Sequence, residues 1–167
     1  MKRVLVAYAS KHGSTREVAE RVAETLRTAG LPVDVMPAAD VGHLRGYDTV
    51  VLGGALYTGR LLKDARDFLA RHRDALSVRN VAVFALGPKT TEPSDVAGSR
   101  AQLDRALAKT PEIEPVSVAI FGGVVDPGKL RFPFNRMPAS DARDWEAIRT
   151  WADELARYVP ARHAVAP

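Results

Sequence analysis

The chain has 167 residues, of which 46% are hydrophobic and 26% are charged, as is usual for a globular domain. It contains no cysteine, which excludes disulfides, thiolate metal sites, iron–sulfur ligation and a cysteine nucleophile. Redox chemistry, if the chain performs any, must therefore come from a bound cofactor. The net charge of +4 permits contact with anions, but the basic residues are scattered among acidic ones, and we expect no nucleic-acid partner.

The length favours one domain, which we place over residues 1–160, followed by a C-terminal tail over residues 161–167. No apolar run approaches the roughly 20 residues that span a bilayer. The first apolar run is too short and too promptly closed by polar residues for a signal peptide. We therefore expect a cytoplasmic protein.

Apolar runs alternate with helical patterns along the whole chain, which is typical of an α/β fold. Strands are predicted over residues 3–9, 33–36, 49–54, 81–86 and 115–121. The first, third and fourth strands are continuously apolar, which indicates that both of their faces are covered. The second and fifth strands alternate more, which favours positions at the edges of the sheet.

Helices are predicted over residues 18–29, 62–76, 96–107 and 145–159, with Gly30 and Pro32 ending the first. Right-handed crossovers with the second and fifth strands outermost give a doubly wound, three-layer fold with a five-stranded parallel sheet of order 2-1-3-4-5. The order reverses between strands one and three. We expect a ligand in the crevice at that point.

A polar loop follows the first strand and leads directly into the first helix. Its residues are Ser10, Lys11, His12, Gly13, Ser14 and Thr15. Backbone N–H groups at the helix start, together with the hydroxyls, would hold a phosphate. The alternative interpretation is a capping box of Ser14 and Glu17, which would only begin a helix.

Two other doubly wound classes fit less well. A receiver domain needs acidic residues at the end of strand one to hold Mg²⁺, whereas the chain has Tyr8, Ala9 and Ser10 there. A dinucleotide fold needs three glycines in the loop, which here contains Gly13 alone. A mononucleotide phosphate is the better match.

The loop from Ser10 to Thr15 resembles the flavodoxin loop that holds the phosphate of FMN. A second segment resembles the loop that borders the flavin ring: Gly54, Ala55, Leu56, Tyr57, Thr58 and Gly59. A third occupies the place of the other ring-binding loop: Leu86, Gly87, Pro88 and Lys89. The resemblance covers nearly the whole chain and implies a flavodoxin-like fold with FMN as the cofactor.

Within that superfamily the chain is more similar to the flavodoxin-like, menaquinone-dependent protoporphyrinogen oxidases. Residues 53–59, residues 121–126 and the pair Asp144 and Trp145 carry this similarity. The segment between Val124 and Ser140 is shorter than the insertion of the characterised oxidases. The resemblance therefore implies the family, and porphyrinogen as a substrate follows from it less well.

The resemblance assigns roles to single residues, each with a plainer alternative. Tyr57 would stack on the flavin ring or be an ordinary turn tyrosine. Gly59 would let its loop reorient when the flavin is reduced, or be a plain turn glycine. Lys89 would favour reduced flavin or be a solvated lysine. His12 would donate a ring N–H to the phosphate, while Lys11 is expected to point to solvent.

We name no catalytic side chain, because flavin hydride chemistry does not need a dedicated one, and no histidine spacing predicts a metal site. Residues 129–136 interleave basic and apolar side chains. They would cap the flavin, contact a membrane containing quinone, or pack as an irregular connection, and the last is the default interpretation.

The leading hypothesis is an FMN-dependent oxidoreductase that acts on a small organic partner such as a quinone. One alternative is a flavodoxin-type electron carrier, although such carriers tend to be acidic and this chain is basic. The other is a module that binds a phosphorylated ligand without redox chemistry. Oligomeric state does not follow from the sequence.

Overall fold

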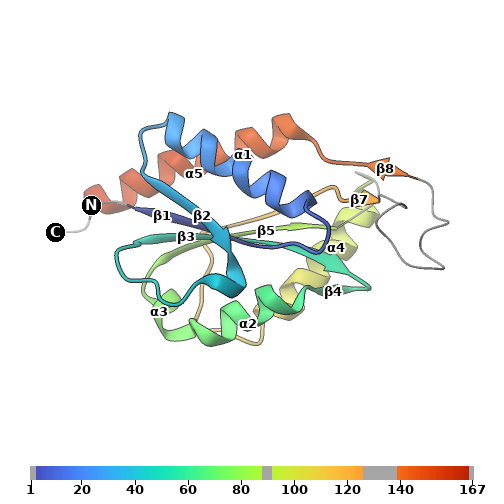
Figure 1. The fold of residues 1–167 in the computed structure, drawn as a ribbon, viewed down its shortest axis with the longest axis horizontal. Coiled ribbons are helices and arrows are strands. Elements are labelled where there is room, and N and C mark those ends of the chain that lie inside the picture. The colour runs from blue at the N-terminus through green and yellow to red at the C-terminus, as the bar shows by residue number, and fades with distance from the viewer. Residues whose placement is uncertain (1–2, 88–91, 126–138, 166–167) are drawn as a thin grey trace.

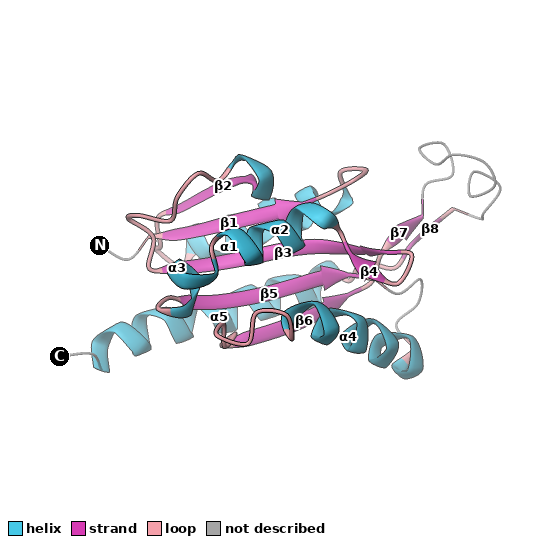
Figure 2. Ribbon diagram, turned by 90° about the horizontal axis from the view of Figure 1, so that it is seen from below, coloured by secondary structure: helices cyan, strands magenta, loops and turns pink. Residues whose placement is uncertain are grey.

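The computed structural model describes residues 3–87, 92–125 and 139–165. Five parallel strands form the sheet, in the order β2-β1-β3-β5-β6 (Figure 2). These strands are β1 (Val4–Ala9), β2 (Val33–Pro37), β3 (Thr49–Tyr57), β5 (Asn80–Leu86) and β6 (Ser117–Phe121). Because β5 and β6 are the fourth and fifth parallel strands along the chain, the predicted order 2-1-3-4-5 is confirmed.

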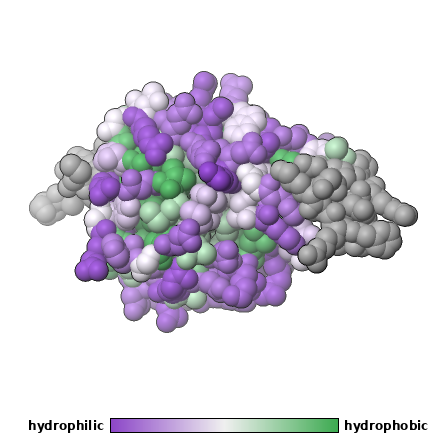
Figure 3. Space-filling view, viewed as in Figure 1, coloured by the Kyte–Doolittle hydropathy of each residue, from purple (hydrophilic) through white to green (hydrophobic). Residues whose placement is uncertain are grey.

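Helices cover both faces of the sheet, which confirms the three predicted layers (Figure 1). One face carries α1 (Ser14–Thr28) and α5 (Trp145–Val165). The other carries α2 (Lys63–Arg71), α3 (Arg73–Ser77) and α4 (Pro93–Leu107). α5 continues past residue 160, into the segment expected to be a tail. Polar residues dominate the surface drawn in Figure 3, with smaller apolar areas between them.

The two faces of the sheet build two separate cores. Successive strand residues point to opposite faces, so Val4 and Val6 pack under α1 and α5, whereas Leu5 packs on the opposite side. Phe84 of β5 belongs to the first core and Phe68 of α2 to the second. β1, β5 and most of β3 are therefore apolar at consecutive positions, while β2 and β6 are only half-buried, as edge strands are.

The apolar stripe predicted as one helix over residues 62–76 forms two helices that meet at His72. The backbone φ of His72 is −104°, far from the helical value of about −63°. Its ring is buried, with Nε2 3.2 Å from the carbonyl oxygen of Val41, just after the short 3-10 helix Ala38–Asp40. This long-range contact has no signal in the local periodicity.

Three short strands were not predicted, because two residues leave no periodic pattern. β7 (Val124–Val125) and β8 (Ser140–Asp141) form a separate antiparallel pair. β4 (Arg60–Leu61) pairs antiparallel with the end of β3, which runs three residues beyond its predicted end. The expected loop after strand three is therefore a hairpin, a difference that bears on the site.

Candidate functional site

The reversal of strand order falls between β1 and β3, as predicted. β1 pairs with β2 on one side and with β3 on the other, and Ala9 lies opposite Gly54 where β1 ends. The next helix after β1 lies on one face of the sheet, and the next helix after β3 lies on the other (Figure 1). The two helices thus diverge from the carboxyl ends of β1 and β3, the position at which ligands of doubly wound proteins bind.

The loop after β1 has a folded shape of its own. The Gly13 N–H donates to Ser10 Oγ over 2.8 Å, which closes the turn. Gly13 has a φ of 92° and is the N-cap of α1. Since Ser14 is the first helical residue and no side-chain cap bond forms, the capping-box interpretation of Ser14 and Glu17 is wrong. The residues of the loop are arranged for something other than capping α1.

Thr15 is the member of the loop whose hydroxyl is buried without a partner among the described residues. Its side chain is 0% exposed, and Oγ1 is buried with no hydrogen-bond partner among the described residues. Other threonines of α1 avoid this: Thr25 Oγ1 donates to the Arg21 carbonyl, and Thr28 Oγ1 to the Glu24 carbonyl. An unpaired buried hydroxyl costs about 1–3 kcal/mol, which an anion held at the helix start would recover.

Lys11 and His12 lie at the rim of this loop. His12 is half-buried and Lys11 is exposed. The Lys11 ammonium nevertheless has a defined place, with Nζ 4.0 Å from the centroid of the Tyr57 ring. The first and second predicted site segments are thereby in direct contact.

The second segment is the tip of the β3–β4 hairpin. Gly54, Ala55 and Leu56 lie within β3 rather than in a loop, so the prediction of a loop there is wrong. A Cβ at Gly54 would lie 2.7 Å from Leu61 Cδ1, which shows that this glycine serves packing of the hairpin on the core. Tyr57, at the end of the strand, is half-buried, and its stacking on a flavin stays a prediction.

The hairpin turn consists of Thr58 and Gly59, between the paired residues Tyr57 and Arg60. Their φ angles are 49° and 81°, the signs of a type I′ turn. Glycine adopts this conformation freely, whereas threonine, being β-branched, is strained in it. Both residues are exposed. Reorientation of Gly59 on flavin reduction stays a prediction.

The third segment meets the second at Gly87. Leu86 is buried at the end of β5, and the Gly87 N–H donates to the Phe121 carbonyl over 3.1 Å. A Cβ at Gly87 would lie 2.8 Å from Leu56 Cδ1 and 2.7 Å from Ser99 Oγ, so a larger residue would separate these elements. Pro88 and Lys89 lie outside the described residues, as does the stretch 129–136.

Arg143 is a site residue that the sequence analysis missed. Its side chain is 10% exposed and lies against the first turn of α1, 3.5 Å from the Glu17 carboxylate. It donates two hydrogen bonds to Asp141, of 3.0 and 2.8 Å, and its guanidinium carbon lies 4.8 Å from the Trp145 ring centroid. These hydrogen bonds lower the pKa of the Asp141 carboxyl below its ordinary value and raise the pKa of Arg143.

Two backbone features hold Arg143 in place. The Ala142 N–H donates to the Gly123 carbonyl over 2.9 Å, and a Cβ at Gly122 would lie 2.0 Å from the Ala142 carbonyl oxygen. On the other side, the Asp144 carboxylate accepts the N–H of Ala147 and caps α5. No local pattern could have connected residues 17 and 143, although the resemblance did single out Asp144 and Trp145.

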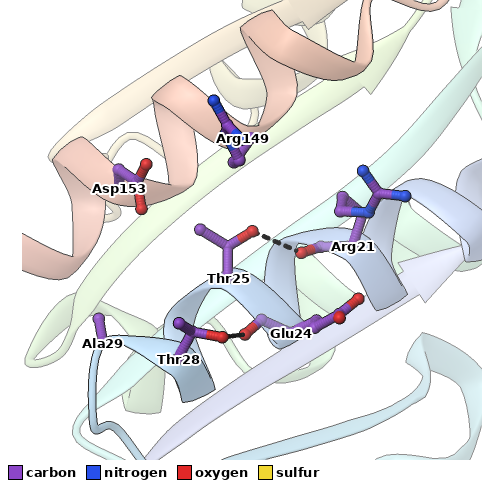
Figure 4. A pocket seen from close by; sticks show the side chains of 7 residues that line it. All are labelled: Arg21, Glu24, Thr25, Thr28, Ala29, Arg149 and Asp153. Carbon is purple, nitrogen blue, oxygen red and sulfur yellow. Dashed lines mark hydrogen bonds between the residues drawn. The ribbon is translucent and has the colours of Figure 1, made fainter.

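A pocket of about 570 Å³ lies elsewhere, between the C-terminal half of α1 and α5 (Figure 4). It is lined by Arg21, Glu24, Thr25, Thr28, Ala29, Arg149 and Asp153. The threonine hydroxyls there already donate to helix carbonyls, and cations and carboxylates are mixed. The threonine hydroxyls of this pocket are therefore paired, unlike the hydroxyl of Thr15.

Two absences hold for residues 3–87, 92–125 and 139–165. No group of three or more histidine, aspartate or glutamate side chains there could hold a metal ion. Within the same residues, no helix is both long enough and apolar enough to cross a membrane.

The fold and the loop after β1 define a class: a doubly wound mononucleotide-binding domain of the flavodoxin-like type. The chain belongs to the Flavodoxin domain family, whose model matches residues 5–137. This membership and the flavodoxins among the similar structures indicate FMN as the cofactor. The buried hydroxyl of Thr15 and the helix start beside it fit the phosphate of that group.

Individual relatives are distant. The chain is 22% identical to protoporphyrinogen IX dehydrogenase (quinone) from Escherichia coli strain K12 over 176 aligned residues, covering 92% of this chain and 94% of that protein. A mutant flavodoxin from Pseudomonas aeruginosa superposes with a TM-score of 0.63 at 18% identity, covering 95% of this chain and 99% of that one. Rubredoxin oxygen:oxidoreductase from Desulfovibrio gigas superposes with a TM-score of 0.63 at 19% identity, covering 98% of this chain and 37% of that one.

Proposed function

We propose that this protein is an FMN-dependent oxidoreductase that exchanges electrons with a small organic partner such as a quinone. The observation that carries the proposal is the buried, unpartnered Thr15 Oγ1 in the first turn of α1. A hydroxyl in that position would donate to a bound anion. The adjoining helix start supplies backbone N–H groups and positive potential.

The chain's own residues would hold FMN at three places. Ser10, Gly13, Ser14 and Thr15 would hold the phosphate, His12 would add a ring N–H, and the hairpin tip with Tyr57 would border the ring. Bound FMN would supply the electron transfer itself. The third place is the other ring-binding segment, Leu86, Gly87, Pro88 and Lys89, which is proposed from the resemblance alone. No side chain is assigned a proton-transfer role.

A quinone is favoured as partner because the E. coli relative carries quinone in its name and aligns over most of its length. An electron carrier of flavodoxin type is the second candidate, and the chain's charge of +4 argues against it, since charge complementarity governs such docking. A non-redox module for a phosphorylated ligand is the third. A cytoplasmic location and contact of residues 129–136 with a membrane surface remain predictions.

The first test substitutes Thr15→Val, which removes the hydroxyl and keeps the shape. FMN should bind about ten- to a hundredfold more weakly, because a hydrogen bond to a charged group is lost. The protein without FMN should be no less stable, since the lost hydroxyl was unsatisfied there. Fluorescence titration with FMN and urea unfolding measure the two effects.

Thr25→Val is the matched control. Thr25 lies on the same helix and is 8% exposed, but its hydroxyl is already bonded to Arg21. We expect unchanged FMN affinity and some loss of stability, the opposite of the Thr15 result. Equal FMN affinity in the wild type and in Thr15→Val would remove the main support for this phosphate site.

Redox function is tested separately. An anaerobic reductive titration followed by visible absorbance should show one flavin per chain. Turnover of NAD(P)H with quinones, reducing quinone to quinol with two electrons and two protons, would distinguish an enzyme from a carrier. A purified protein that takes up no FMN would defeat both redox candidates and leave the phosphate-ligand module.

A further inference from the structure

The contact between Lys11 and Tyr57 lies between two parts of the proposed FMN site. Lys11 belongs to the loop after β1 and Tyr57 to the end of β3, and these strands are neighbours in the sheet. The ammonium lies 4.0 Å from the ring centroid, so it covers one face of the ring. A lysine of the phosphate loop thus occupies an aromatic face where the ring of a nucleotide would stack.

Two attractions compete for this ammonium. A cation–π contact at an exposed site is weak, whereas charge-assisted contact with a phosphate dianion is stronger. Lys11 is exposed and belongs to the same loop as Gly13, and its four-carbon stem is flexible, so its ammonium is able to exchange one partner for the other. A phosphate arriving beside Gly13 and Thr15 would therefore draw the ammonium away from Tyr57.

We propose that Lys11 makes ring stacking at Tyr57 depend on phosphate binding, and so determines the preference for FMN over riboflavin. This inference rests on the proposed FMN site. Without a phosphate, the ammonium covers Tyr57 and opposes stacking of a bare flavin. With a phosphate present, the same charge binds the anion and the ring face is open. The two halves of the ligand then bind cooperatively.

The test measures riboflavin affinity with and without saturating inorganic phosphate, in sodium chloride of matched ionic strength. In the wild type, phosphate should tighten riboflavin binding about two- to fivefold, the factor that corresponds to the free energy of an exposed cation–π contact. Lys11→Met keeps an apolar stem and removes the charge. This variant should bind riboflavin about two- to fivefold more tightly than wild type without phosphate, and phosphate should have no effect on it.

FMN affinity should change in the opposite direction. Lys11→Met should bind FMN more weakly than wild type, so the ratio of FMN to riboflavin affinity should fall about tenfold. Lys11→Gln should repeat the result if the missing charge is the cause. Lys63→Met is the matched control, because Lys63 is an exposed lysine of α2 paired with Asp67, and its loss should leave both flavin affinities unchanged.

The outcomes separate this inference from the proposed function. A wild-type protein that binds neither FMN nor riboflavin would overturn both. FMN binding with the same phosphate effect in wild type and Lys11→Met would overturn the role of Lys11 alone. Parallel weakening of both flavins in the variant would also overturn it, because Lys11 would then only support the loop.

Discussion

The guanidinium of Arg143 lies 3.5 Å from the carboxylate of Glu17, so the segment before α5 is ion-paired with the first turn of α1. A bare carboxylate in that turn would lower the positive potential that a phosphate needs. Arg143 offsets part of this charge, because its guanidinium is shared between Glu17 and the nearer Asp141. The C-terminal part of the chain therefore contributes to the anion site formed by the N-terminal part.

We expect Arg143→Leu to weaken FMN binding about two- to fivefold, the size of a charge effect at a helix end. The loss should be largest at low salt and shrink at high salt, because Glu17 is exposed and its charge is screened. FMN titrations at two salt concentrations measure both effects.

Arg149→Leu controls for the loss of a positive charge on α5, and its FMN affinity should equal that of wild type. Adding Glu17→Gln to Arg143→Leu should restore most of the affinity. If the double variant binds FMN as weakly as Arg143→Leu alone, neutralisation of Glu17 is not the role of Arg143.

His72 should make the protein less stable in acid. Burial is the main cause that lowers the pKa of its imidazole below the ordinary 6.5, Arg71 adds to this, and the Val41 carbonyl opposes it. The unfolded chain therefore binds more protons near and below that pH. The stability contributed by neutral His72 is complete above about pH 6.5 and is lost as the pH falls through the folded-state pKa.

Urea unfolding between pH 7.5 and pH 5 (about neutral to mildly acidic) measures this slope. His72→Gln should reduce the pH dependence, although its stability at neutral pH will also change. His43→Gln removes an exposed histidine and should keep the wild-type slope. Equal slopes in wild type and His72→Gln would contradict the assignment of this acid sensitivity to His72.

Thr58→Asn should stabilise the protein by about 1 kcal/mol, because asparagine tolerates a positive φ and Asn-Gly is the preferred type I′ pair. Thermal unfolding without FMN measures the change. Thr28→Asn is the control: Thr28 is an exposed helical residue, and this substitution should bring no gain. If Thr58→Asn is instead destabilised, the contacts of the threonine side chain stabilise the fold by more than its backbone strain destabilises it.

Gly122→Ala should destabilise the protein by about 1–3 kcal/mol or more, because the added methyl meets a backbone carbonyl that cannot rotate aside. It should also weaken FMN binding, since displacing Ala142 moves Arg143 from α1. Gly98→Ala in α4, with open space around its Cβ, should instead gain about 0.5–1 kcal/mol. Similar effects of both substitutions on unfolding would contradict the close approach at Gly122.

The sheet could be predicted because its evidence is local. Apolar runs and their alternation report how each strand is covered, and the glycine at residue 13 with its hydroxyl neighbours marks the strand-to-helix turn. The end of α1 could be predicted in the same way, and Gly30, which follows it, has a positive φ. These features depend on neighbours within a few residues.

The parts that could not be predicted depend on contacts between distant residues. The apolar stripe around His72 continues through the helix break, where the His72 ring meets the Val41 carbonyl of a distant segment. Arg143 and Glu17 share no motif, and the Lys11 ammonium was expected in solvent although it lies on Tyr57. In each case a flexible or polar side chain reaches its partner from another element.

The register of β3 up to Tyr57 fixes which side of the hairpin carries the aromatic ring. Side chains alternate along a strand, so one residue inserted between Gly54 and Tyr57 would carry the ring to the reverse side. Extra residues placed after Tyr57, by contrast, would lengthen the tip and leave the ring where it is. The tip of the hairpin can thus change in length while the side chain of Tyr57 keeps its orientation.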